Sequence, residues 1–398
     1  MQGRGVDEGR KERELSIYIH WPFCRSKCPY CDFMSIPKSD LDVNNSEEYK
    51  EVEFLLLKDL KNSLRELESP FVKTIFFGGG TPSLMSPQSM EKIINFVVKN
   101  YKTDSNIEIS LEANPATFSR QKLREIREAG VNRLSLGVQS FHDRDLEFLG
   151  RIYDSEQAIK AAETVASTFS NYSFDFIFGY QSQTIDDLKN NLSMAVDFGC
   201  PHISCYQLTF EKGTPFFCLL QDGKINQITE TQEVECFRFI QDFLKEFSLN
   251  RYEISNYALK NFESKHNLTY WRYKNYLGVG PSAHSRLVFG DKKYELKKFS
   301  DIDRWRESLY GNLSAYEEKN VLTDYEQLEE IFVMGLRLSE GISIKDLKSR
   351  FSDSMLNPIL KRISLLSNEN LFSNSETQIK LSENGVLKQN SVLEFLFN

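Results

Sequence analysis

The sequence predicts an α/β protein with six strand–helix units, followed by a smaller second domain. Six short runs rich in β-branched and aromatic residues alternate with longer segments of helical period, and this regularity breaks near residue 250. Such alternation is typical of a parallel sheet covered by helices. Six units form either an open or partial barrel or a doubly wound sheet. Both folds bind ligands at the carboxyl ends of their parallel strands.

The predicted strands and helices follow one another in chain order. The six strands are Ile17–Ile19, Thr74–Phe77, Ile107–Leu111, Arg133–Gly137, Phe174–Phe178 and His202–Ser204. The five helices between them are Glu47–Leu67, Pro87–Asn100, Ser119–Ala129, Ser155–Thr168 and Ile185–Phe198. Serines that can cap helices stand at or before several of these starts, and Gly130 and Gly199 follow two of the ends.

The second domain is expected to be α+β. A hairpin is predicted around Gly290, joining Arg286–Phe289 to Tyr294–Leu296. The last part of the chain predicts three short helices and a strand, a pattern compatible with a winged-helix-like unit: Gln327–Leu338, Ile344–Phe351, Asn357–Leu366 and Gln378–Leu381. The expected organisation is a charged tail over 1–14, a barrel over 15–250 and a C-terminal domain over 251–398.

Composition and charge exclude several classes of protein. The 398 residues are 40% hydrophobic and 27% charged, which is globular usage rather than that of a disordered chain. The net charge of −8 argues against nucleic acid as a partner. Seven cysteines, an odd number, and a charged N-terminus argue against a secreted disulfide scaffold, and no apolar run approaches the ~18 residues of a membrane span. We therefore expect a cytoplasmic protein with no integral membrane segment.

Three cysteines lie close together directly after the first predicted strand. Cys24, Cys28 and Cys31 are spaced so that one loop can wrap several sulfurs around a single metal centre, and thiolates select zinc or iron–sulfur clusters. Structural zinc normally takes four ligands, and no further cysteine or histidine follows nearby. Three thiolates on a four-iron cluster leave one iron open to a substrate or cofactor. A zinc-stabilised interaction module remains the alternative.

With the neighbouring Tyr30, this CxxxCxxC loop resembles the cluster loop of the radical S-adenosylmethionine (SAM) superfamily. The resemblance implies a partial (β/α)6 barrel and a [4Fe–4S] cluster on Cys24, Cys28 and Cys31. It also implies that the amino and carboxylate groups of SAM chelate the open iron. Similar segments continue along nearly the whole chain.

Polar groups at the ends of the other predicted strands match the SAM contacts of this superfamily. The implied residues are Tyr18, Tyr30, Gly79, Gly80, Thr81, Glu112, Gln139, Arg151 and Asp175. The resemblance implies that the glycines meet the amino end of SAM, Arg151 its carboxylate, and Gln139 and Asp175 its ribose. Two departures are the loop over 179–184 and Tyr153, where relatives usually have histidine.

Downstream segments resemble the group of oxygen-independent coproporphyrinogen III oxidases. They are Leu208–Pro215, Tyr252–Ala258, His266–Trp271 and Tyr276–Ser285. This group contains true oxidases, which decarboxylate coproporphyrinogen III, and HemW-type haem chaperones. The expected C-terminal domain is accordingly HemN-like.

Three features favour the chaperone branch over the oxidase. The oxidase usually has a fourth loop cysteine where this chain has Phe33, and it has a longer N-terminal extension. His266–Trp271 resembles the chaperone element HNxxYW, which implies haem at His266 with Tyr270 or Trp271 stacking on the porphyrin. A buried, hydrogen-bonded His266 is the alternative reading. The resemblance also implies haem as cargo, an acceptor protein and an electron donor, while oxidase activity stays the alternative function.

Overall fold

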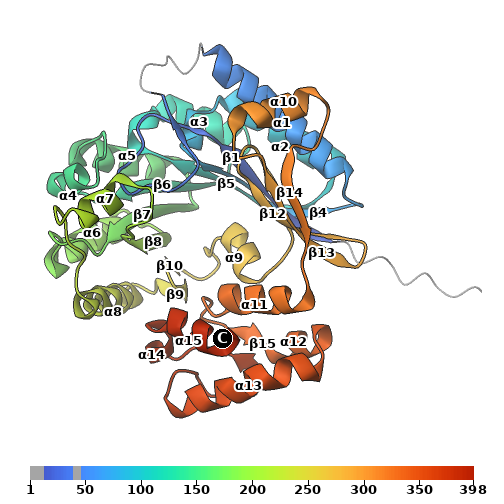
Figure 1. Cartoon of the computed structure of the whole chain (residues 1–398). Coiled ribbons are helices and arrows are strands. Elements are labelled where there is room, and N and C mark those ends of the chain that lie inside the picture. Colours follow the sequence, from blue (N-terminus) through green and yellow to red (C-terminus); the bar gives the residue numbers. More distant parts are fainter. Residues whose placement is uncertain (1–12, 39–45) are drawn as a thin grey trace, which may run out of the picture.

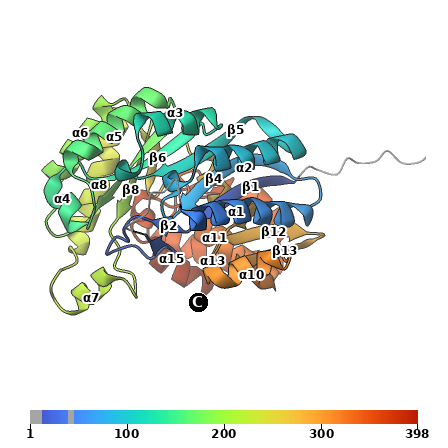
Figure 2. The same cartoon turned by 90° about the horizontal axis from the view of Figure 1, so that it is seen from above.

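The computed structural model describes residues 13–38 and 46–398, so most of the predicted N-terminal tail lies outside the described residues. At its centre is a 12-stranded sheet with the order β14-β13-β12-β11-β1-β4-β5-β6-β7-β8-β10-β9. The sheet curves, and most of the helices of the first half of the chain lie on its outer side (Figures 1 and 2).

The six predicted strands are confirmed, and each is parallel to its neighbour. They are β1 (Glu14–Trp21), β4 (Phe71–Gly79), β5 (Lys102–Ala113), β6 (Arg133–Gln139), β7 (Tyr172–Phe178) and β8 (His202–Gln207). The five predicted helices are confirmed as α1 (Glu47–Arg65), α2 (Pro87–Asn100), α3 (Arg120–Glu128), α5 (Ser155–Thr168) and α6 (Ile185–Asp197). Ser46, Ser86 and Ser119 cap three of them by accepting a backbone N–H bond. The α/β fold class is therefore confirmed.

Residues after 250 extend the sheet at both edges. Beyond β8 lie the antiparallel strands β10 (Asn256–Ala258) and β9 (Asn250–Glu253). On the other side, β11 (Tyr276–Val279) is parallel to β1, and β12 (His284–Phe289), β13 (Lys292–Lys298) and β14 (Tyr316–Val321) continue antiparallel. The predicted hairpin at Gly290 is the β12–β13 turn. The boundary at residue 250 stays a prediction, and the main sheet and its core continue across it.

Several elements were not predicted from the sequence. The longest is α8 (Glu230–Glu246), which follows β8 and completes a sixth strand–helix unit. The others include α4 (Asp143–Phe148), α7 (Pro215–Gln221), α9 (Lys265–Trp271) and α10 (Ile302–Tyr310), the two-residue strands β2 (Phe23–Cys24) and β3 (Ile36–Pro37), and the 3-10 turns η1 (Pro82–Leu84) and η2 (Pro115–Thr117). Most of these helices are too short for a helical period to stand out.

The C-terminal part has a hydrophobic core of its own and lies below the sheet in Figure 1. The three predicted helices are confirmed as α11 (Asp324–Gly335), α12 (Ile344–Arg350) and α13 (Asp353–Asn368), with shifted ends. The predicted strand is shorter, since β16 (Gln378–Ile379) pairs only with β15 (Ile342–Ser343). Two further helices, α14 (Glu383–Val386) and α15 (Gln389–Phe397), end the chain. Within the described ranges, no helix is long and apolar enough to cross a membrane.

Candidate functional site

The three-cysteine loop lies at the carboxyl end of β1 and is held at both ends by backbone hydrogen bonds. Gly80 N donates to Trp21 O at 2.7 Å, and Ile36 N donates to Pro22 O at 2.7 Å. A turn within the loop is closed by Cys31 N donating to Cys28 O at 3.1 Å. The loop therefore has a fixed start and end at the edge where a parallel sheet binds its ligands.

All three loop cysteines are free thiols. Burial raises the pKa of Cys24 and of Cys31, and charge on the neighbouring thiols raises them further. Across residues 13–38 and 46–398, no three His, Cys, Asp or Glu side chains are already arranged as a metal site, so the sulfurs are not gathered around one point in this conformation. The donor set itself, three sulfurs on one short loop, fits an iron–sulfur cluster.

Gly79 and Gly80, at the end of β4, allow the strand to approach the start of the loop. A Cβ on Gly80 would lie 2.5 Å from Phe23 O, and one on Gly79 would lie 2.7 Å from Trp21 O. Gly79 also has a φ of +111°, which disfavours other residues. Gly79 N donates to Glu112 Oε2 at 3.2 Å. The glycine segment thus connects β4 both to the cysteine loop and to the carboxylate at the end of β5.

Two half-buried carboxylates lie on strands of the barrel, Glu112 on β5 and Asp175 on β7. Burial, together with the charge of Asp175, raises the pKa of Glu112 to about 8. Burial also raises the pKa of Asp175, although Ser135 Oγ and Ser173 Oγ donate to its carboxylate at 2.7 and 2.9 Å. An ammonium or hydroxyl group of a ligand that donates to such a desolvated carboxylate stabilises its charged form. Both residues therefore suit the polar groups of a nucleoside carrying an amino group.

Arg151 connects the strand-end region to the cysteine loop. Its Nη1 donates to Cys28 Sγ at 3.0 Å and to Tyr30 Oη at 3.1 Å. Its Nε donates to Tyr153 Oη at 2.9 Å, and that hydroxyl donates to Gly137 O at 2.8 Å. Tyr153, which departs from the family pattern, thus holds the guanidinium in place. The second departure, the loop over 179–184, is held by Gln183, which accepts from Gly179 N at 3.0 Å and donates to Tyr180 Oη at 2.9 Å.

One cavity brings several of these positions together: Cys28, Thr81 and Arg151 line it with Arg25, Asn114 and Thr117. Gln139 ends β6 with a φ of +65°, and Tyr18 lies on the Phe76 ring inside the barrel. Arg25, Asn114 and Tyr153 were not among the predicted site residues. The position of Asn114 at a strand end was a signal that could have found it.

The predicted haem residues lie on α9, next to the barrel interior. His266 is 1% exposed and stacks on Phe76, and burial lowers its pKa to about 3. Its Nδ1 bonds to Thr74 Oγ1 and its Nε2 to Tyr270 Oη, both at 2.7 Å. Both ring nitrogens are therefore engaged, as in the alternative reading of a buried histidine, and haem binding at His266 stays a prediction.

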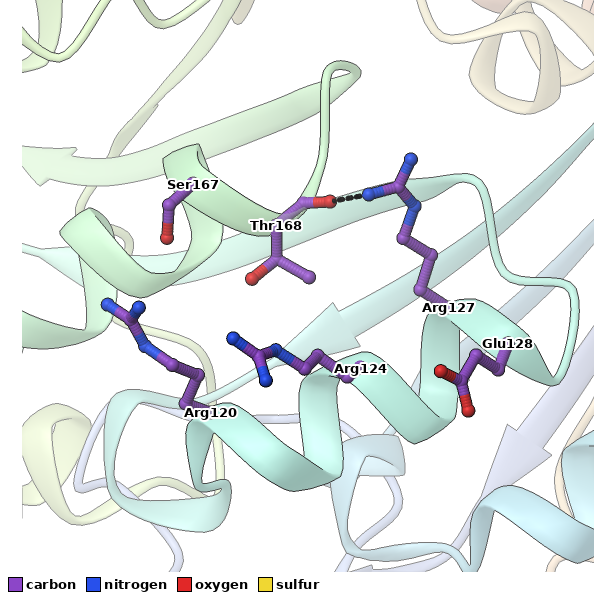
Figure 3. A pocket seen from close by; sticks show the side chains of 6 residues that line it. All are labelled: Arg120, Arg124, Arg127, Glu128, Ser167 and Thr168. Atoms are coloured by element: carbon purple, nitrogen blue, oxygen red, sulfur yellow. Dashed lines mark hydrogen bonds between the residues drawn. The ribbon is translucent and has the colours of Figure 1, made fainter.

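A separate cavity of about 400 Å³ lies on the outer helices, between α3 and the end of α5. Figure 3 shows its lining residues Arg120, Arg124, Arg127, Glu128, Ser167 and Thr168. Arg127 Nη1 donates to Thr168 O at 2.6 Å, which ties the two helices together. None of the predicted site residues lines this cavity.

Comparison with known families gives the class of the protein. The radical SAM superfamily model matches residues 18–195, and the HemN C-terminal domain model matches residues 322–387. The solved coproporphyrinogen III oxidase (HemN) from Escherichia coli has the same fold, with a TM-score of 0.80 over 97% of this chain and 91% of that one, at 18% identity. Fold, cysteine loop and family models together define a radical SAM protein, for which a [4Fe–4S] cluster and SAM are the implied cofactors.

Curated relatives narrow the class further. The "Heme chaperone HemW" of Bacillus subtilis is 33% identical over 95% of this chain and 97% of the relative. That of Haemophilus influenzae is 33% identical over 96% and 97%. A mitochondrial "Radical S-adenosyl methionine domain-containing protein 1" of Danio rerio is 32% identical over 83% of this chain and 74% of the relative. The chain belongs to the HemW family, which confirms the resemblance found in the sequence.

Proposed function

We propose that the protein is a haem chaperone, which binds haem and transfers it to an acceptor protein. The observation that carries this proposal is the match to curated haem chaperones over nearly their full length. The oxidase, in contrast, shares the fold at 18% identity. Phe33, which replaces the fourth cysteine of the oxidase loop, is 65% exposed and offers no ligand there. The proposal includes a haem-acceptor protein and an electron donor.

The cofactors of the proposal are a [4Fe–4S] cluster and SAM. Cys24, Cys28 and Cys31 would hold the cluster, which when bound supplies an electron to SAM. Burial raises the pKa of Cys24 and of Cys31, so cluster binding must work against the tighter hold of these two thiols on their protons. Arg151 would give up its bond to Cys28 and turn its guanidinium to the carboxylate of SAM. Glu112 and Asp175 would accept hydrogen bonds from the ammonium and ribose groups.

An anaerobic assay of the reconstituted protein, supplied with SAM and a reductant, tests this function. The expected result is binding of haem, its transfer to haem-free acceptor proteins, and no change to added coproporphyrinogen III. Formation of protoporphyrinogen IX would reject the chaperone function and support the oxidase alternative. Elemental analysis of the same preparation tests the zinc-stabilised module, because zinc without sulfide would reject the cluster.

His266 is tested separately in the same haem titration. On the proposal that it ligates haem iron, His266→Ala weakens haem binding while iron and sulfide contents stay unchanged. The structure adds a cost to this ligation, since the His266 Nε2 bond to Tyr270 must open first. Unchanged haem affinity in His266→Ala would leave His266 as a core residue that holds α9 on the barrel.

A further inference from the structure

The face of α9 opposite His266 borders a large cavity between the barrel and the C-terminal part. His266 and Tyr270 lie four residues apart and point to the barrel interior, where their rings meet edge to face. Leu268 and Arg272, also four residues apart, line the cavity instead. Leu268 belongs to the segment that resembles the HNxxYW element. One face of this segment is occupied by the His266–Tyr270 contact, and the other face borders the cavity.

The cavity has the size of a ligand site. Its volume is about 710 Å³, within the range of ~300–1,000 Å³ that small-molecule sites occupy. It is lined by the β9–β10 edge, by α9 and by the turn after α11. That turn is tied to the β9 side, because Ser339 N donates to Tyr252 O at 2.9 Å and Ser339 Oγ donates to Arg251 O at 2.8 Å. The walls therefore come from the edge of the main sheet, from α9 and from the turn after α11, and these hydrogen bonds fix the sheet edge to the turn.

Apolar groups and cations share the lining. Tyr252, Ala258, Leu268 and Leu338 supply apolar surface. The charged residues are Arg251, Lys260, Glu263, Arg272 and Glu340. Arg272 is held by both oxygens of Glu340, at 2.7 and 3.0 Å, and Arg251 donates to Gln241 Oε1 at 2.9 Å.

Lys260 is the cation of this lining that is still available to a ligand. It is exposed and has no hydrogen-bond or ion-pair partner among residues 13–38 and 46–398. A flat apolar ring that carries carboxylates matches this combination, because the ring packs against the apolar wall while a carboxylate pairs with the lysine.

We propose that this cavity binds haem, with the porphyrin ring against Leu268 and Leu338 and a propionate on Lys260. The inference rests on the proposed chaperone function and gives the cargo a place. This position is an alternative to haem ligation by His266, because the ligand lies on the other face of α9 and the His266–Tyr270 bond stays closed.

Titration of the full-length protein with haemin, without SAM and followed by Soret absorbance, tests the inference. Leu268→Glu puts a charge on the apolar wall and Lys260→Glu repels a propionate, so each is expected to raise the dissociation constant at least 10-fold. The matched control is Lys189→Glu, an exposed lysine on α6 with the same change of charge, expected to stay within twofold of wild type.

The outcomes distinguish failure of this haem position from failure of the proposed chaperone function. Failure of the wild-type chain to bind haemin would reject the chaperone function itself. Haemin binding that is unchanged in Lys260→Glu, an exposed substitution that leaves the core intact, would overturn the cavity assignment even if Leu268→Glu did not fold. Loss of binding in His266→Ala, with both cavity variants like wild type, would also overturn it.

Discussion

Tyr153→Phe tests whether the hydroxyl of Tyr153 holds Arg151 in place. The substitution removes one oxygen and keeps the buried ring. The substitution loses the bond from Arg151 Nε at 2.9 Å and the donation of the hydroxyl, which is shared between Gly137 O at 2.8 Å and Val138 O at 3.0 Å. A neutral hydrogen bond contributes ~1 kcal/mol and one to a charged group ~1.5–3 kcal/mol. Arg151 keeps its bonds to Cys28, Tyr30 and Gly137, so we expect the free energy of unfolding to fall by about 2.5 kcal/mol, the lower end of that sum.

Urea unfolding of the cofactor-free protein measures this loss. Tyr172→Phe is the matched control, because the hydroxyl of this buried tyrosine donates one neutral hydrogen bond, to Phe198 O at 2.8 Å, and among the described residues has no bond to a charged group. We expect that control to lose ~1 kcal/mol, so the difference between the variants reports the bond to Arg151. A second readout is SAM affinity, which should fall in Tyr153→Phe and not in Tyr172→Phe. A loss in Tyr153→Phe no larger than in the control would refute this role of Tyr153.

Three further predictions follow from the site and its support. Cys24→Ala should lose the cluster, measured as iron and sulfide after anaerobic reconstitution, while the exposed Cys218→Ala should keep it; wild-type iron in Cys24→Ala would reject the ligand assignment. Because the pKa of Glu112 is raised to about 8, the folded protein holds this proton more tightly than the unfolded chain does, and wild type loses stability as pH rises from about 4.5 to 8. Glu112→Gln should therefore gain stability relative to wild type by up to ~1.4 kcal/mol per pH unit over this range in urea unfolding, and equal differences at pH 5 and pH 8 would contradict it. Lys298→Met breaks the fully buried ion pair with Asp59, whose charged atoms lie 2.7 Å apart, and should lower the free energy of unfolding by ~3–5 kcal/mol in the same assay. The double variant with Asp59→Asn should recover part of this loss. A loss below ~1 kcal/mol in Lys298→Met would show that the pair is dispensable.

The strands could be predicted because their signal is local. Buried parallel strands are short runs of β-branched and aromatic residues, and in β1 Ile17 and Ile19 are fully buried. The helix α8 was missed although its capping box, Thr229 with Gln232, is a local signal that was present in the sequence. The hairpin of β12 and β13 was predicted, but its place in the main sheet was not, because pairing between β11 and β1 depends on residues more than 200 positions apart.

The residues of the candidate site show the same difference between local sequence patterns and contacts that join distant parts of the chain. Cysteine spacing is a local pattern, so Cys24, Cys28 and Cys31 could be singled out from the sequence. The contact of Arg151 with Cys28 joins residues 123 positions apart, and the support from Tyr153 looked only like a departure from the family. His266 shows a different limit, because a motif assigns importance to a helix without saying which face of it meets a ligand.

A chain of hydrogen bonds joins the proposed haem cavity to the proposed SAM site, and its direction follows from the donors. Ser173 Oγ donates its hydrogen to Asp175, so it must accept at 2.8 Å from His202 Nδ1. His202 Nε2 then accepts at 2.9 Å from the hydroxyl of Tyr252, on the cavity wall. Burial lowers the pKa of His202 well below its usual value, which keeps the ring neutral and the direction fixed. A ligand that moved Tyr252 would therefore disturb the bonds that orient Asp175, and by reciprocity SAM bound at Asp175, as proposed above, would act back on the cavity.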